Sequence, residues 1–478
     1  MTFSTYLFLF LFLPLTLGGY FALSRVKNPV WQRIFLLLSS LVFVGWAGVY
    51  HLVWMLCSAA LAYLFARLLG RETEGRRNAR RALFVLGVLL QIALLAFCKY
   101  YHFFGAYLND FFFHSETVYR LILPLGISYY TFQQVMLLIR VYQGEVRVGD
   151  PLTYALFVSF FPYRASGPIV DYGTMTDQLA DENRRRFSSE RFSRGLYLLV
   201  VGLSKKLVLA DTLAVFANNG YGAEGVLSLP VAWATALSYT FQLYFDFSGY
   251  SDMATGISLM LGFDLPQNFD SPYKSESCTA FWRRWHMTLG RALTTCVYIP
   301  LGGNRRGKAR TCLNVFLVMI VSGIWHGEDL TFLLWGAIYG VIMVFERVSM
   351  PLLEKIPKAL RVLGTFLAVN FLWVLFRAPD FASALNLYRG MFNFSSLSVS
   401  GFVSLTADGI VGLPAFAALA LVVGMLAASF VTVFCFENAY RKAEGLVLTK
   451  KTLFWLVFLF VLSFVHLSRL STFIYVNF

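Results

Sequence analysis

The chain has 478 residues, of which 58% are hydrophobic and 14% charged, and its mean hydropathy is +0.63. Soluble domains carry about 25% charged residues, so this composition excludes a soluble globular protein and makes the lipid bilayer the first expected partner. The net charge of +14 is typical of a membrane protein with basic cytoplasmic loops, and it argues against nucleic acid as a partner.

The first apolar segment, 3–23, has no basic residue before it, whereas Arg25 and Lys27 follow it. We therefore expect a retained first helix with its N-terminus outside, rather than a cleaved signal peptide. The next apolar stretch, 34–69, is too long for one crossing, since about 20 residues span the hydrocarbon. Glycines near its middle predict two short crossings hinged at 45–48.

Apolar segments recur to the end of the chain, with no soluble domain between them. They predict helices near 82–98, 100–114, 120–142, 152–163, 192–218, 228–247, 250–263, 312–326, 330–348, 360–377, 411–436 and 452–470. The expected fold is an all-α integral membrane protein with about 11–14 membrane segments, formed as a single domain over 1–478. No internal repeat is visible, which weakens the interpretation as an inverted-repeat transporter.

Two segments, 161–170 and 266–310, are too polar and too rich in Pro and Gly for simple membrane helices. Irregular backbone at membrane depth is tolerated where protein buries it or where it lines a cavity. We expect both segments to be re-entrant loops that fold into the interior.

The six cysteines lie apart from one another in the sequence. None forms a C-x-x-C pair, the spacing typical of zinc and redox sites. We expect small buried apolar residues at these positions, with no disulfide framework and no bound metal.

Two histidines are the main candidates for chemistry. His326 ends an uncharged run that begins at Thr311, and an ionisable residue at membrane depth is a functional candidate by default. Basic residues at 305–310 place the start of this run at the cytoplasmic face, about 24 Å from His326 along a helix. His286 lies among arginines, so it approaches His326 only if its loop dips inward. Histidine suits general acid–base catalysis, although a histidine beside a tryptophan is also a common packing residue.

Two acids, Asp246 and Asp252, lie in an apolar stretch. They could orient a histidine, but buried acids are usually paired, and a structural ion pair is the favoured interpretation. The basic runs 184–186 and 205–206 are expected at the cytoplasmic surface.

Four blocks of sequence resemble the membrane-bound O-acyltransferase family, and within it the bacterial branch that includes the alginate O-acetylation membrane protein. They are Asn268-Phe269-Asp270-Ser271-Pro272-Tyr273, Phe281-Trp282-Arg283-Arg284-Trp285-His286, Tyr298-Ile299-Pro300-Leu301-Gly302-Gly303-Asn304-Arg305 and Trp325-His326-Gly327. Supporting blocks extend the resemblance over nearly the whole chain. Arg140 departs from the family pattern, since an acid is common at that position.

The resemblance implies a many-helix fold with a central funnel or tunnel and a core at about 120–348. It implies that His326 and His286 are catalytic. Residues expected to bind the substrate or the donor are Trp285, Trp325, Arg283, Arg284, Asp246, Ser248, Asp252 and Asn304. It further implies a bacterial cytoplasmic membrane protein that moves an acyl group, acetyl above all, from cytoplasmic acetyl-CoA towards an exported glycan. An SGNH-type acyltransferase outside the membrane is the expected partner.

The aromatic tail, 473–478, is similar to an ending found in this branch. There the tyrosine that corresponds to Tyr475 is proposed to carry the acyl group, and a phenol near a general base can become a nucleophile. An interfacial aromatic anchor is the alternative interpretation of the tail.

Three other functions remain open. The same machinery could transfer D-alanine from an acyl carrier protein thioester to teichoic acid. The chain could instead be a transporter whose histidines relay protons, or a scaffold for an exported enzyme that has no activity of its own. Consumption of a thioester separates the acyltransferases from the other two.

Overall fold

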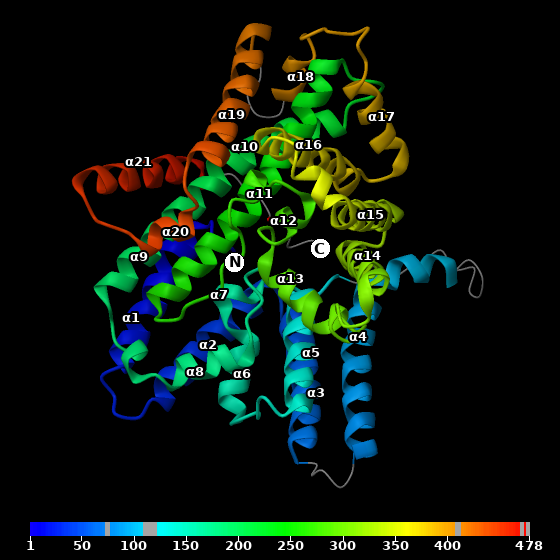
Figure 1. Ribbon diagram of the computed structural model, residues 1–478. Coiled ribbons are helices and arrows are strands. Elements are labelled where there is room, and N and C mark those ends of the chain that lie inside the picture. Colours follow the sequence, from blue (N-terminus) through cyan, green and yellow to red (C-terminus); the bar gives the residue numbers. More distant parts are fainter. Residues whose placement is uncertain (72–76, 109–121, 407–412, 469–472, 475–478) are drawn as a thin grey trace.

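The computed structural model describes residues 1–71, 77–108, 122–406, 413–468 and 473–474, with the backbone alone for 102–108. These ranges contain helices and no β-strand (Figure 1). Within them, seven helices are long and apolar enough to cross a membrane. They are α2 (Val30–Ala47), α3 (Val49–Arg71), α4 (Arg77–Leu108), α14 (Gly307–His326), α15 (Leu330–Leu353), α16 (Lys358–Arg377) and α19 (Ala415–Cys435). The protein is therefore an all-α, multi-pass membrane protein, as its sequence predicts.

The other helices complete the fold. In the first half these are η1 (Phe8–Phe12), α1 (Leu13–Leu23), α5 (Ile127–Gln143), α6 (Pro151–Ser159), α7 (Phe161–Arg164), α8 (Tyr172–Ala180), η4 (Glu182–Arg185), α9 (Ser189–Ser204), η5 (Lys205–Ala210) and α10 (Asp211–Tyr221). In the second half they are α11 (Leu229–Met260), η6 (Pro272–Lys274), α12 (Cys278–Trp282), α13 (Met287–Leu293), η7 (Thr294–Tyr298), α17 (Phe381–Met391), α18 (Phe402–Thr406), α20 (Ala439–Glu444) and α21 (Lys450–His466). The last of these extends away from the main bundle in Figure 1.

The predicted hinge between two short crossings is confirmed. Helices α2 and α3 meet at Gly48, whose φ of 140° is a conformation that residues with a side chain rarely adopt. The amide of Gly48 bonds back to the carbonyl of Gly45 at 3.0 Å, which ends α2 at this point.

The prediction of two helices over 82–98 and 100–114 is wrong for the described residues, because α4 runs unbroken from Arg77 to Leu108. Lys99 falls at the expected boundary. Its ammonium group donates a hydrogen bond to the carbonyl oxygen of Trp325, so its charge does not require the helix to end.

The prediction of separate helices at 228–247 and 250–263 is also wrong. Helix α11 is continuous over 32 residues, and Gly249 lies in its interior. This glycine serves close packing rather than a break: a Cβ atom on Gly249 would lie 2.8 Å from the carbonyl oxygen of Gly202 in α9. Small residues at a crossing let two membrane helices approach closely.

The lysines at 205–206 are buried, so their expected place at the cytoplasmic surface is wrong. Lys205 pairs with Asp252 at 2.6 Å, and Lys206 pairs with Asp246 at 2.6 Å and with Asp211 at 2.8 Å. The charge is tolerated inside the protein because each ammonium group meets a carboxylate.

Both irregular segments are folded into the protein, as predicted. Every residue of 161–170 is buried. The segment 266–310 forms the short helices η6, α12, α13 and η7. It passes between α11 and the antiparallel pair α14 and α15, near the centre of Figure 1.

Helices α14 and α15 pack closely because glycines face each other at their crossing. A Cβ atom on Gly323 would lie 2.5 Å from the carbonyl oxygen of Phe332 and 3.3 Å from the Cα atom of Gly336. This close packing sets the position of the last turn of α14, which carries His326.

Candidate active site

His326 is the last residue of α14, and only 2% of its surface is exposed. Aromatic rings enclose its imidazole, with centroid distances of 4.7 Å to Trp325, 5.3 Å to Trp335 and 5.0 Å to Phe376. These neighbours come from α14, α15 and α16. The imidazole therefore lies in a dry, aromatic environment at the end of three packed helices.

His286 reaches the interior through an unusual backbone conformation. It precedes α13 with φ 44° and ψ 52°, in the left-handed region that residues other than glycine seldom occupy. Such strained positions are common at functional sites. The turn is held by Asn268, whose carbonyl accepts a hydrogen bond of 2.9 Å from the amide of Met287.

The side chain of Asn268 determines the tautomer of His286. Its Oδ1 accepts a hydrogen bond of 3.3 Å from the amide of Thr288, and a backbone amide can only donate. The same oxygen lies 3.0 Å from Nδ1 of His286, so Nδ1 must carry the proton. In the neutral imidazole, Nε2 then holds the lone pair and accepts hydrogen bonds.

Trp325 joins the two histidines. Its ring centroid lies 6.3 Å from that of His286 and 4.7 Å from that of His326. On the other side, the ring of Phe247 in α11 packs against His286 at 4.7 Å. The inward-folding loop thus brings the two histidines into one site, as the sequence analysis required for a catalytic pair.

Four polar residues of the site were not identified from sequence. Asn268 and Thr288 bond to each other and orient His286. Lys99 and its neighbour Tyr100 donate to the carbonyls of Trp325 and Ile324, in the last turn of α14. Lys99 could have been identified from sequence, because it is a charged residue in the otherwise apolar run of α4.

The acids of α11 form ion pairs, as the favoured interpretation predicts. Asp246 and Asp252 are buried against Lys206 and Lys205, respectively. Ser248 lies between them in the sequence and is also buried. Both acids are thus already paired, so a role for either of them in binding substrate would need a change in that pairing.

The other residues expected to bind substrate are spread over different surroundings. Trp285 is buried against Phe281, whose ring stacks on it at 5.5 Å, and it packs in the core. Arg283 and Arg284 are exposed. Asn304 is also exposed, at the start of α14 and therefore at the opposite end of this helix from His326.

The described part of the C-terminal tail enters the protein core. The amide of Ile474 donates a hydrogen bond of 2.8 Å to Oδ2 of Asp246. The ring of Phe473 packs edge-on against Tyr250 at 4.9 Å and lies 4.6 Å from the ammonium nitrogen of Lys206. Tyr475, the expected acyl relay, lies outside the described residues.

A basic cavity of about 490 Å³ lies where α15 ends and α16 begins. Its lining includes four cations, Lys274, Arg284, Lys358 and Arg361, and one acid, Glu276. Glu276 pairs with Lys358 at 3.1 Å and with Arg361 at 2.7 Å, and the hydrogen bond from Lys358 lowers the pKa of the Glu276 carboxyl. The excess of positive charge suits an anionic ligand.

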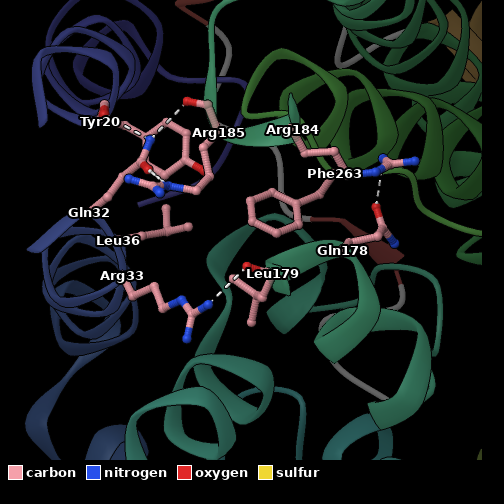
Figure 2. Close-up of a pocket in the computed structure, with 9 residues that line it drawn as sticks. All are labelled: Tyr20, Gln32, Arg33, Leu36, Gln178, Leu179, Arg184, Arg185 and Phe263. Atoms are coloured by element: carbon pink, nitrogen blue, oxygen red, sulfur yellow. Dashed lines mark hydrogen bonds between the residues drawn. The ribbon is translucent and has the colours of Figure 1, made fainter. Parts of the chain in front are cut away.

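A second, much smaller cavity lies between α2 and η4 (Figure 2). Gln32 donates to the carbonyls of Tyr20 and Arg185 at 3.1 Å each, and Arg33 donates to the carbonyl of Leu179 at 2.9 Å. With about 10 Å³ of space, this cavity has room for about one water molecule. Its hydrogen bonds join α2 to the carbonyls of Leu179 and Arg185, and it is not a substrate site.

Among the residues that the structure describes, no three His, Cys, Asp or Glu side chains gather in a way that could hold a metal ion.

Comparison with known proteins identifies relatives of this chain. The model of the membrane-bound O-acyltransferase family matches residues 113–385, which is more than half of the chain. A peptidoglycan O-acetyltransferase of Helicobacter pylori is 37% identical over 428 residues, covering 83% of this chain and 81% of that protein. A probable alginate O-acetylase, AlgI, of Pseudomonas aeruginosa is 36% identical over 406 residues, covering 84% of this chain and 76% of that protein.

A teichoic acid D-alanyltransferase of Bacillus subtilis is 27% identical over 244 residues, covering 47% of this chain and 59% of that protein. The similarity to the two acetylating proteins is thus both higher and more extensive. With a buried histidine pair at the end of packed membrane helices, and with this match over most of its length, the chain belongs to the membrane-bound O-acyltransferase family and is an acyltransferase.

Proposed function

We propose that this protein is an O-acetyltransferase of the bacterial cytoplasmic membrane, which passes acetyl from cytoplasmic acetyl-CoA towards an exported cell-surface polysaccharide or peptidoglycan. The observation that carries the proposal is the buried pair of His286 and His326, joined by Trp325. Two relatives named for O-acetylation of peptidoglycan and alginate support the choice of acetyl and of a glycan acceptor.

In the proposed reaction, His326 takes the proton from the acceptor hydroxyl, and the hydroxyl oxygen attacks the thioester carbonyl. A C–O bond forms, the C–S bond breaks, and the proton passes from His326 to the departing thiolate, so that the products are an acetyl ester and free coenzyme A. His286 presents the lone pair of Nε2, so in its neutral form it accepts a hydrogen bond from a second donor of the acceptor, such as a neighbouring sugar hydroxyl, and thereby orients the acceptor while the reacting hydroxyl donates its one proton to His326.

The basic cavity supports coenzyme A as the donor. Its volume of about 490 Å³ is within the range of about 300–1,000 Å³ typical of ligand pockets. Arg284 lines this cavity and lies two residues before His286 in the same loop. Its cations could hold the phosphates of the nucleotide. An anionic lipid headgroup offers the same chemistry, and competition for acetyl-CoA distinguishes the two.

The tail supports a covalent relay as a part of the proposal. Tyr475 follows Ile474, whose amide Asp246 holds. In the relay, the phenol of Tyr475 would be the first hydroxyl to accept acetyl, and its ester would then pass acetyl to an SGNH-type partner outside the membrane. Such a partner is needed in this proposal because the glycan that accepts the acetyl group lies outside the bilayer.

D-alanyl transfer from a carrier protein is the second candidate, and the similarity to the teichoic acid D-alanyltransferase supports it. A proton-relaying transporter and a scaffold without activity are the candidates of other classes. Neither of these consumes a thioester.

The experiment is the incubation of purified full-length protein with acetyl-CoA, followed by assay of free coenzyme A and by intact-mass and peptide mass spectrometry. Wild type is compared with His326→Ala and Tyr475→Phe. An acetyl adduct on the C-terminal peptide that is absent from both variants supports the relay.

Release of coenzyme A that depends on His326 and on added glycan or partner, without an adduct, supports direct transfer. If neither product forms with acetyl-CoA but D-alanyl carrier protein is consumed, the second candidate replaces the first. If no thioester is consumed at all, the acetyltransferase proposal is overturned.

A further inference from the structure

Arg164 is a buried cation that has no carboxylate partner among the described residues. It ends α7, in the segment 161–170, and only 1% of its surface is exposed. Its Nη2 donates one hydrogen bond of 3.3 Å to the carbonyl of Gly126, whereas Nε and Nη1 make no hydrogen bond. The ionisable groups that interact with it are the phenols of Tyr130, Tyr163 and Tyr250, and no acid is among them.

This arrangement is unusual because a guanidinium group stays charged in proteins and costs several kcal/mol to bury without an anion. The other buried cations discussed above meet this requirement. Lys205 and Lys206 each have a carboxylate at 2.6 Å, both supplied by α11. Of these three cations, only Arg164 has no carboxylate partner within the part of the chain that the structure describes.

The groups around Arg164 are donors that suit the same ligand. Its guanidinium carbon lies 4.2 Å from the centroid of the Tyr130 ring, and the hydroxyl of Tyr130 has no hydrogen-bond partner. Tyr130 lies in the first turn of α5, and Arg164 bonds to Gly126, the residue that caps this helix end, where the helix dipole favours a negative charge. Unpaired donors, a fixed positive charge and a positive helix end all complement a group that only accepts hydrogen bonds.

The backbone holds this arrangement in place. Gly126 caps α5 with φ 67°, and a Cβ atom at this position would collide with the carbonyl oxygen of Arg164. The segment 161–170 and the start of α5 are therefore packed directly against each other. The geometry of the donors is built into the fold rather than left to a mobile side chain.

This cluster lies close to the histidine pair. Tyr250, which interacts with Arg164, also interacts with Tyr129, the neighbour of Tyr130. The ring of Tyr129 lies 6.2 Å from the rings of both His286 and Trp325. None of the residues that line the basic cavity belongs to this cluster, so the two are distinct.

We propose that Arg164, Tyr130 and the N-terminus of α5 form a buried binding site for a carboxylate, next to the catalytic histidines. The planar guanidinium group matches a carboxylate, and the hydroxyl of Tyr130 adds a third donor. Two sources offer this chemistry. One is a small free carboxylate such as acetate. The other is a carboxylate on the acceptor glycan, and this source rests on the proposed function.

The test measures thermal unfolding of the purified full-length protein in lipid nanodiscs, at constant ionic strength balanced with sodium chloride. The probes are sodium acetate and a glucuronic acid disaccharide, the latter beside its neutral, carboxyl-reduced form. A rise in the unfolding midpoint that saturates with acetate supports the site with a free ligand. A rise with the acidic disaccharide, but not with acetate or the neutral sugar, supports the glycan as the source.

Arg164→Gln is expected to abolish the response. Arg140→Gln is the matched control and is expected to keep it, because Arg140 is partly exposed and already pairs with Asp171 at 2.8 Å. If Arg164→Gln does not fold, Tyr130→Phe keeps the ring on which the guanidinium stacks and is expected to weaken binding about tenfold, the typical effect of losing a hydrogen bond to a charged group.

A wild-type midpoint that responds to neither probe, or an Arg164→Gln variant that responds as wild type does, overturns the proposal. Release of coenzyme A from acetyl-CoA is assayed on the same preparation. If coenzyme A is released but the unfolding midpoint does not respond to a carboxylate, this site is rejected and the proposed function stays intact. A carboxylate response without release of coenzyme A leaves this site and rejects the proposed function.

Discussion

The amide of Ile474 donates a hydrogen bond of 2.8 Å to Asp246, a residue 228 positions earlier in the chain. The other oxygen of this carboxylate pairs with Lys206 at 2.6 Å, and Lys206 also lies over the ring of Phe473. One buried ion pair thus joins α11, η5 and the described part of the C-terminal tail. The acid is shared between the core of the protein and the tail.

Replacement of Asp246 tests this shared role. Asp246→Asn keeps the size of the side chain but leaves Lys206 with Asp211 alone, and loss of one partner of a buried pair costs about 3–5 kcal/mol. We expect a clear fall in the thermal unfolding midpoint in detergent. Glu190→Gln is the control, because its pair with Arg194 is exposed and such pairs contribute about 0–1 kcal/mol. Equal midpoints for the two variants would contradict the assignment.

Asn268 is expected to control the activity of His286. Asn268→Ala removes the acceptor that holds the proton on Nδ1, so we expect release of coenzyme A from acetyl-CoA to fall about 100-fold, the lower end of the contribution of a positioned acid–base group. Asn183→Ala, an exposed position in η4, serves as the control. Retention of full activity in Asn268→Ala would exclude the tautomer from the mechanism.

Two substitutions of His286 distinguish the effect of its left-handed backbone on folding from the role of its side chain in catalysis. Asn tolerates positive φ better than most residues, whereas a β-branched residue does not. His286→Asn is therefore expected to keep the wild-type unfolding midpoint and to lose activity. His286→Val is expected to lose both, because φ 44° strains its backbone. The comparison of the two midpoints checks the conformation, and a stable His286→Val variant would count against it.

The crossing of α14 and α15 is expected to be sensitive to a single methyl group. Gly323→Ala places a Cβ atom 2.5 Å from the carbonyl oxygen of Phe332, so the helices must separate. We expect a loss of about 1–3 kcal/mol in stability, as for other overpacked sites, and reduced activity, since His326 lies three residues later. Gly424→Ala in α19 is the control, because no atom lies within 4 Å of its Cβ position. An equal tolerance of both changes would refute the close crossing.

Charge in the basic cavity is expected to affect the KM for acetyl-CoA more than kcat. Arg361→Gln removes a cation and should raise KM several-fold, with a smaller difference at high salt. The hydrogen bond from Lys358 lowers the pKa of Glu276, so this carboxylate stays charged near neutral pH. Glu276→Gln should therefore lower KM by releasing both cations. If the two variants change KM in the same direction, the cavity does not bind the donor.

Much of the framework follows from local sequence. Apolar segments of sufficient length predict the membrane helices, and the glycines at 45–48 predict the hinge between α2 and α3, because both depend only on nearby residues. The position of His326 at the end of an uncharged helix follows in the same way. The pairing of Asp246 and Asp252 with cations follows from the cost of a lone buried charge.

The errors arose where a residue's role depends on a distant partner. Gly249 was assigned to a helix boundary, but it packs against Gly202 within a continuous helix. Lys206 was assigned to the cytoplasmic surface, but α11 supplies its carboxylate. Local sequence allows a break or a continuous helix at Gly249, and a surface or a buried position for Lys206. The contact with a second helix decides between them.

Local sequence is sufficient for the membrane class, most helices and the two histidines as candidates, because hydrophobicity and burial cost act on residues close together in the chain. The inward fold of the His286 loop to Trp325, and the orientation of its imidazole by Asn268, depend on contacts in the folded protein. The same is true of Arg164, which is buried without an acid among the described residues. These contacts join segments far apart in sequence, and their free energy depends on geometry that no local pattern records.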